Sequence, residues 1–235
     1  MWFSKIATAY FFVLAFVFGQ LNPTRAQGIF LSRGESNFGV EAGLSHGEHA
    51  TTLIGSFGYS LKGVFDFGLS VGRTQFSDLF DDRNLDLNAV SLSPSLTIHL
   101  GKPNEESPLG FLVFGGYERD FFSGDALGNR SMHANVFPSG AGFYTLQEIT
   151  NQLRLIPVIV VSYVHSIFEF NDSGLSQNET ENNVVAGLNL NFGIKDQPGN
   201  IFVLSPGIAL IDVGSNDVKM AFSISLAYVL KEKQK

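Results

Sequence analysis

The chain has 235 residues, with 15 lysines and arginines against 22 aspartates and glutamates, so its net charge is -7. This acidic balance argues against a nucleic-acid-binding protein. The absence of cysteine excludes a disulfide framework, a thiolate metal site and a lipid-modified N-terminal cysteine. Phenylalanine (23) and glycine (25) are both abundant, which is unusual for a soluble domain of this size.

The N-terminal residues have the pattern of an export signal. Lys5 precedes an apolar stretch over residues 6–19, and Thr24 and Ala26 supply small residues at an A-x-A-like cleavage site. The apolar stretch is shorter than the roughly 20 residues of a membrane-spanning helix, which argues against an anchor. We therefore expect residues 1–26 to be a signal peptide and residues 27–235 to form a single domain.

The rest of the chain predicts β-strands with one apolar face. In "VFDFGLSVG" (64–72), Phe65, Phe67 and Leu69 alternate with small or polar residues, which is the period of a β-strand. The same alternation or a high density of β-forming residues occurs over 36–45, 50–61, 64–76, 85–100, 109–119, 140–149, 152–168, 183–194, 200–211 and 217–230. We expect an all-β, up-and-down antiparallel barrel of ten strands. A barrel of eight strands is the alternative, if segments 109–119 and 140–149 do not both span the membrane.

The connections between these segments alternate in length. Short links such as 62–63 and 195–199 alternate with longer ones, of which 120–137 and 169–182 are the longest. Outer-membrane barrels have short periplasmic turns and longer extracellular loops. The predicted long loops are acidic and include Asp120 and Glu169, so a rim that meets the divalent cations of lipopolysaccharide is one interpretation.

The composition of the second strand face indicates which face is wet. A soluble barrel would need lysine, glutamate and threonine outside, whereas this face is mostly glycine, serine, asparagine and alanine. Small polar side chains suit a narrow lumen, so we expect the apolar face to contact lipid. Aromatic residues near the strand ends predict two interfacial girdles: Tyr59, Phe65, Phe192, Phe202 and Tyr228 at one end, and Phe76, Tyr163 and Phe168 at the other.

Three prolines fall inside predicted strands. Pro94, Pro157 and Pro206 cannot donate a ladder hydrogen bond, and a closed barrel has no edge strand to accommodate them. Each therefore predicts a bulge or a gap in the ladder.

Four features of the sequence together resemble those of a known group of proteins. They are the export signal, the glycine- and phenylalanine-rich strands, "LSPSLTIHLG" (92–101) and the final "SISLAYVL". The chain resembles the small bacterial outer-membrane β-barrels of the OmpA/OmpW-like group. This resemblance implies location in the bacterial outer membrane, contact with outer-membrane lipid and lipopolysaccharide, and insertion by the barrel-assembly machinery. The last strand ends at Leu230 and "KEKQK" follows, whereas members of the group often end on an aromatic residue.

The histidines do not predict an enzyme. His165 and Ser166 are adjacent in a strand and point to opposite faces, so they cannot form a dyad. His46, Glu48 and His49 share a turn that fits a solvated loop better than a metal site, and His99 and His133 have no evident partner. We expect no catalytic residue, no metal and no cofactor.

Four charged residues fall on the small, polar face: Glu41, Asp66, Arg154 and Lys219. We expect them to line the lumen, either as an ion-pair network or as the wall of a narrow pore. Glu41 and Lys219 are expected to meet where the first and last strands close the barrel. The predicted function is a structural, surface-exposed barrel or a narrow passive pore. The alternatives are an outer-membrane lipid-modifying enzyme and a secreted, soluble, lipocalin-like barrel.

Overall fold

The computed structural model describes residues 27–32, 34–77, 86–104, 107–128, 130–172, 175–196, 199–213 and 218–231. The predicted signal peptide lies outside these residues. The elements are the 3₁₀ helices η2 (Gln27–Phe30) and η3 (Asp125–Leu127) and the strands β1 (Asn37–Gly47), β2 (Ala50–Leu61), β3 (Phe65–Phe76), β4 (Leu87–Gly101), β5 (Leu109–Gly116), β6 (Glu118–Ser123), β7 (Ser131–Thr145), β8 (Gln147–Glu148), β9 (Leu153–Asp172), β10 (Leu175–Lys195), β11 (Ile201–Ile211) and β12 (Lys219–Lys231). Within the described residues, no helix has the length and apolarity needed to cross a membrane.

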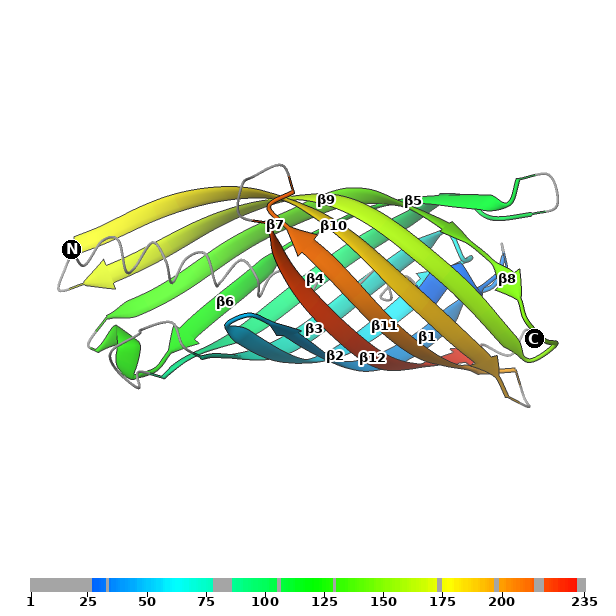
Figure 1. Ribbon diagram of the computed structural model, residues 1–235, viewed down its shortest axis with the longest axis horizontal. Helices are drawn as coiled ribbons and strands as arrows, with labels where there is room; N and C mark the ends of the chain where they lie inside the picture. The colour runs from blue at the N-terminus through cyan, green and yellow to red at the C-terminus, as the bar shows by residue number, and fades with distance from the viewer. Residues whose placement is uncertain are drawn as a thin grey trace.

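The strands close into one antiparallel barrel (Figure 1). Each barrel strand pairs with its neighbours in the chain, and β1 pairs with β12 to close the ring. β5 and β6 both lie between β4 and β7, so together they occupy one strand position. β8 is a short addition that pairs only with the start of β9. The predicted up-and-down barrel of ten strands is therefore confirmed.

Two predicted loops are largely strand. The segment 120–137 contains the end of β6 and the start of β7, so the sixth predicted strand begins at Ser131 and not near residue 140. The segment 169–182 is also strand, because β9 continues to Asp172 and β10 starts at Leu175. The β9 and β10 extensions are polar and lack the apolar alternation on which the prediction depended. The start of β7 does alternate, with Met132, Ala134 and Val136 on its buried face, but its exterior face is polar. The β10 extension lies beyond Val185, which pairs with Ile211, the last residue of β11, so the extension has no partner on β11.

The two ends of the barrel differ. We call the end where β1 begins and β12 finishes the terminal end, and the end where β9 meets β10 the loop end. Figure 1 shows β9 and β10 reaching beyond β11 and β12 at the loop end. This asymmetry is typical of outer-membrane barrels, in which the longer connections lie outside the cell.

The apolar strand face forms the exterior of the barrel, as predicted. The exposed apolar side chains include Phe38, Val40, Leu44, Leu53, Phe57, Phe67, Leu69, Val71, Leu92, Phe143, Ile159, Val161, Leu188, Phe202, Leu204, Phe222, Ile224 and Leu226. The buried interior face carries Asn37, Ser45, Thr52, Ser60, Asp66, Ser70, Thr74, Ser91, Ser93, Ser162, Asn189, Asn191, Ser205 and Ser225. A closed barrel pairs its backbone polar groups internally, so this apolar exterior fits lipid and not water.

One predicted aromatic girdle is partly wrong. Tyr163 is exposed on the exterior at the loop-end side, as predicted. Phe76 and Phe168 are instead buried in the interior, with 3% and 0% of their surfaces exposed. Both share strand parity with interior residues, since Phe76 follows Thr74 and Phe168 follows Ser166 by two positions.

The prolines coincide with gaps in the strand ladders, as predicted. Pro94 lies between the stretches of β4 that pair with β5 and with β6, and Tyr117 N–H donates to its carbonyl at 3.0 Å. Pro206 lies where the pairing of β10 with β11 is interrupted between Asn189 and Phe192. Pro157 lies between the parts of β9 that pair with β7 and with β8. At each proline, the ladder on one side of the strand is interrupted, so the backbone N–H that proline lacks is not required there.

Candidate functional site: the lumen

The interior of the barrel has an apolar level at each end and a polar level between them. The loop-end level, which we call the apolar ring, comprises Ala50, Phe76, Leu87, Ala89, Phe122, Met132, Ala134, Val136, Val164, Phe168, Val185, Ile211 and Ala221. The terminal-end level, which we call the terminal cluster, comprises Ile29, Phe30, Leu112, Tyr144, Ile156, Val158, Val160, Ile201, Val203, Ala227 and Val229. The prediction that mostly small and polar side chains line the lumen therefore holds for the middle level and is wrong at both ends.

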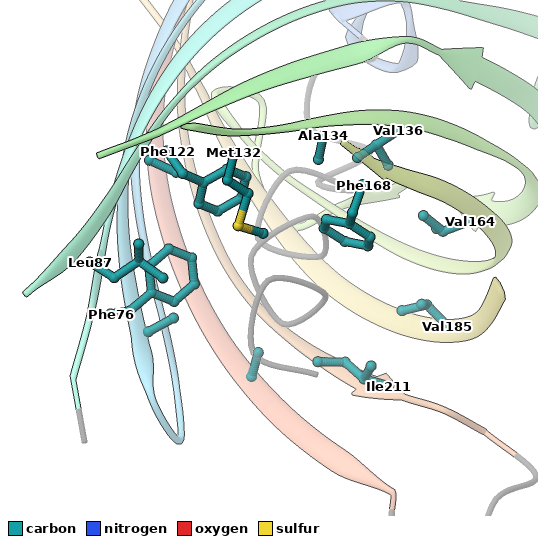
Figure 2. Packing of buried hydrophobic residues seen from close by; sticks show 13 residues of the cluster. Phe76, Leu87, Phe122, Met132, Ala134, Val136, Val164, Phe168, Val185 and Ile211 are labelled. Atoms are coloured by element: carbon teal, nitrogen blue, oxygen red, sulfur yellow. The ribbon is translucent and has the colours of Figure 1, made fainter. Parts of the chain in front are cut away.

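The apolar ring draws on most strands of the barrel. Figure 2 shows its side chains projecting from the surrounding strands toward a common interior space. Phe76 and Phe122 stack with their ring centroids 6.2 Å apart, although they come from β3 and β6. Four members are alanines, whose short side chains project little into the lumen. The loop-end interior is thus mostly apolar, unlike the polar interior of a water-filled porin.

Two carboxylic acids interrupt this apolar wall. Glu118, Asp120 and Phe122 alternate on β6 toward the interior, and Glu118 and Asp120 are 1% and 0% exposed. Asp120 pairs in register with Ala134 of the ring, and Glu118 pairs with Val136. Among the described residues, only the neighbouring Glu118 carboxyl group is placed to interact with the carboxylate oxygens of Asp120, and no other donor forms a hydrogen bond with them. The prediction that Asp120 belongs to an exposed acidic rim is therefore wrong.

Arg119, between these two acids, points the other way. Its guanidinium lies on the exterior, 3.3 Å from Glu169 Oε2, and donates to Asn135 Oδ1 at 2.5 Å. It also lies over the Phe121 ring, 5.8 Å from the centroid. Alternation along the strand thus separates Arg119 from the two interior carboxyl groups.

The chain preceding β1 packs into the terminal end of the barrel. Ile29, Phe30 and Leu31 are buried, and the Lys102 ammonium donates a hydrogen bond to the Leu31 carbonyl. A Cβ atom built on Gly193 would lie 2.7 Å from the Phe30 ring, so glycine is needed for this contact. A cleft of about 660 Å³ lies beside the segment and is lined by Ile29, Phe30, Leu31, Ser32, Gly101, Lys102, Pro103, Asn104, Ser107, Leu109, Leu146, Glu148 and Arg154.

A buried polar network lies next to the terminal cluster. Asp66 Oδ2 and His99 Nε2 are 2.8 Å apart, and both side chains are almost fully buried. Tyr144 Oη lies 3.4 Å from His99 Nδ1 and donates to the Gly101 carbonyl at 3.2 Å. No partner for His99 was predicted from the sequence. Asp66 and His99 both alternate with exterior residues and so face the interior, but their proximity follows only from the pairing register of β3 and β4.

The other predicted lumen charges lie far apart. Glu41 is in register with Ser56 and Ala227. Arg154 pairs with Glu148 at 2.9 Å beside the terminal-end cleft. Lys219 lies at the loop end of β12, two residues before Ala221 in the chain. Ala221 pairs with Gly47, the last residue of β1. The predicted contact between Glu41 and Lys219 is therefore wrong, because the register places Glu41 opposite Ala227, eight residues along β12 from Lys219.

The remaining histidines lie outside the lumen site. His165 is on the exterior, with Nδ1 2.7 Å from Asn182 Oδ1, while Ser166 is fully buried on the interior face. His133 packs edge-on against Phe121 on the exterior. His46 Nδ1 lies 2.9 Å from the Thr51 hydroxyl. Across the part of the chain that the structure describes, no group of three or more histidines, aspartates or glutamates is placed to hold a metal ion.

Comparison with known proteins finds similarity at the level of structure. No protein-family model matches the chain, and no curated protein matches it. Among solved structures, it is similar to the translocator domain of the autotransporter NalP from Neisseria meningitidis, with 11% identity over 93% of this chain and 96% of that one and a TM-score of 0.56. The attachment invasion locus protein Ail of Yersinia pestis matches with 16% identity over 84% of this chain and 99% of that one, with a TM-score of 0.42. The N-terminal β-barrel domain of Pseudomonas aeruginosa OprF matches with 13% identity, the same 84% and 99% coverage and a TM-score of 0.36.

The chain has the fold of the bacterial outer-membrane β-barrel proteins. This fold, the closed ring of strands and the apolar exterior together place the protein in the outer membrane. Because the longer connections of such barrels lie outside the cell, we expect the terminal end to face the periplasm and the loop end to face the outside.

Proposed function

We propose that this outer-membrane barrel holds an apolar molecule in the loop-end half of its lumen and is not a water-filled ion pore. The observation that carries the proposal is the apolar ring. Eight strands already suffice to enclose one small ligand in some barrels, and this barrel has ten. Apolar surface gains roughly 25 cal/mol per Å² on leaving water, so this wall favours an apolar occupant over water.

The terminal end supports the same proposal. Phe30 and its neighbours occupy the mouth that would otherwise connect the lumen to the periplasm. A molecule entering from the loop end would therefore meet a closed base. We retain the prediction that the protein is not an enzyme, because His165 and Ser166 occupy opposite faces and Asp66 and His99 are enclosed within the barrel.

A tryptophan placed in the ring provides a direct test. The only tryptophan is Trp2, within the predicted signal peptide, so mature Phe168→Trp would carry a single reporter. The protein would be placed in nanodiscs and titrated with neutral 9-methylanthracene, which accepts energy from tryptophan. We expect saturable energy transfer that an added Val136→Asn substitution weakens. Phe143→Trp, a reporter on the exterior, should give only the unsaturable signal of probe dissolved in lipid.

The proposal fails if both reporters give the same unsaturable signal. Planar-bilayer recording gives a second check, since a closed base and a dry ring should give no stable conductance steps. Stable small conductance would instead support the narrow passive pore.

A surface role is the second candidate, and the projecting β9–β10 hairpin favours it. Gln177, Asn178, Glu179 and Thr180 are exposed on this extension beyond β11. Such a surface fits contact with lipopolysaccharide through divalent cations, and insertion by the barrel-assembly machinery belongs to the same proposal. Replacing 171–180 with a short turn should remove calcium-dependent binding of lipopolysaccharide vesicles and leave the anthracene signal intact. Unchanged vesicle binding would exclude the hairpin from this role.

A further inference from the structure

We infer that the molecule held in the apolar ring carries a positive charge, which Glu118 and Asp120 bind. The ligand class is an apolar amine or another amphiphilic organic cation. This inference rests on the proposed function, because it assigns a charge to the occupant of the same ring. It differs from that proposal in requiring two particular side chains.

The position of the two acids supports this assignment. Both belong to β6, which also contributes Phe122 to the ring, and their partners in register on β7 are ring members Val136 and Ala134. The carboxyl groups therefore lie in the ring wall and not above or below it. A ligand whose apolar body contacts Phe122 would bring its head group to Asp120, one interior position away.

The electrostatics of this position require a compensating group. A buried carboxylate without a hydrogen-bond donor or counter-ion is strongly unfavourable, and two neighbouring carboxylates repel each other. Apart from the neighbouring Glu118 carboxyl group, no described residue offers a hydrogen-bond donor to either carboxylate oxygen of Asp120. Arg119, the adjacent cation, is directed to the exterior and is engaged by Glu169 and Asn135. In the absence of ligand, a proton shared by the two acids would reduce the charge, and an ammonium group would supply both donors and charge.

The same arrangement disfavours other ligands. A fatty acid would bring a third carboxylate to the pair, which like-charge repulsion opposes. A neutral hydrocarbon would use the ring and leave the acids to their shared proton. The inference therefore predicts an order of affinity of cation above neutral above anion for one apolar body. A preference of about tenfold for the cation corresponds to one hydrogen bond to a charged group.

A matched pair of probes tests this order. Phe168→Trp barrels would be titrated at pH 7 with 9-(aminomethyl)anthracene, which is cationic, and with neutral 9-methylanthracene. We expect about tenfold tighter binding of the cation, and loss of that preference in the Glu118→Gln/Asp120→Asn variant. Glu41→Gln, which removes an interior carboxylate far from the ring on β1, should keep the preference. Heat-modifiable gel mobility would show which variants are folded.

The outcomes separate the two proposals. If the neutral probe does not bind the ring, the proposed function fails. If the two probes bind equally, or the preference survives in the double variant, this inference fails and the apolar site stands. If the double variant does not fold, displacement of the neutral probe from the parent barrel decides the question. Decylammonium should then displace it at lower concentration than decanol, and decanoate at higher concentration, whereas equal potency would overturn the inference.

Discussion

The Asp66 carboxylate and the His99 imidazole meet inside the barrel, with Oδ2 and Nε2 2.8 Å apart. They lie on neighbouring strands β3 and β4, and His99 N–H donates to the Val64 carbonyl at 2.8 Å, which fixes the end of β4 beside the turn before β3. Both side chains are enclosed, so neither can exchange its partner for bulk water. The pair therefore contributes to the stability of the terminal-end half of the barrel.

Removing one member of this pair should destabilise the barrel. Asp66→Asn or His99→Gln leaves the other buried group with a weaker partner, and we expect a loss of about 1.5–3 kcal/mol. The measurement is the urea dependence of unfolding in detergent, followed by gel mobility without heating. His46→Gln, which alters an exposed histidine bonded to Thr51, is the control and should have little effect. Equal stability of all three variants would contradict a structural role for the pair.

The strand positions and the orientation of their faces could be predicted from the sequence because they follow from local alternation. Residues 64–72 alone show which side chains face lipid. The prolines were equally readable, since a missing N–H is a property of the residue itself. The β7, β9 and β10 extensions were missed because strands that leave the membrane no longer need an apolar exterior.

The lumen could not be predicted in the same way because it depends on register. Asp66 and His99 belong to different strands joined by a long connection, so alternation gives their face but not their relative height. Phe76 and Phe168 carry the parity of interior residues, a signal that was available, yet their aromatic character suggested an interfacial girdle. The ring became recognisable only when residues from all sides of the barrel were brought to one level.

A charge introduced on the exterior should have an effect that depends on depth. Leu69 lies in the middle of β3, beside Phe57 and Pro94 on the neighbouring strands. Leu69→Lys should cost about 2–4 kcal/mol, the penalty for a basic residue at the membrane midplane. Leu100→Lys, close to the terminal end of β4, should cost about 0–1 kcal/mol. Urea unfolding in lipid vesicles measures both, and equal penalties would place the lipid boundary elsewhere.

The register of the closing strands can be tested with cysteine pairs in this cysteine-free chain. Glu41 and Ala227 are directly opposed and both face the interior, so Glu41→Cys/Ala227→Cys should form a disulfide on oxidation. Glu41→Cys/Lys219→Cys should not, because eight strand residues separate 219 from 227, or about 26 Å. Non-reducing gel mobility after heating distinguishes the products. A cross-link in the second variant alone would restore the contact predicted from the sequence.

The contact between Phe30 and Gly193 should control the closure of the terminal end. A side chain at Gly193 would begin with a Cβ 2.7 Å from Phe30 Cε1 and 3.3 Å from Ile201 Cγ2, so Gly193→Val must push Phe30 from its place. Such overpacking costs about 1–3 kcal/mol, which favours an open state of residues 27–32 by roughly tenfold. Ile29→Cys, buried in the parent barrel, should then react with a water-soluble maleimide about tenfold faster.

Gly55→Val is the matched control, because nothing lies within 4 Å of a Cβ at that position, and it should leave the rate unchanged. If Ile29→Cys already reacts rapidly beside an unaltered Gly193, the segment does not close the barrel, and the lumen is open to the periplasm.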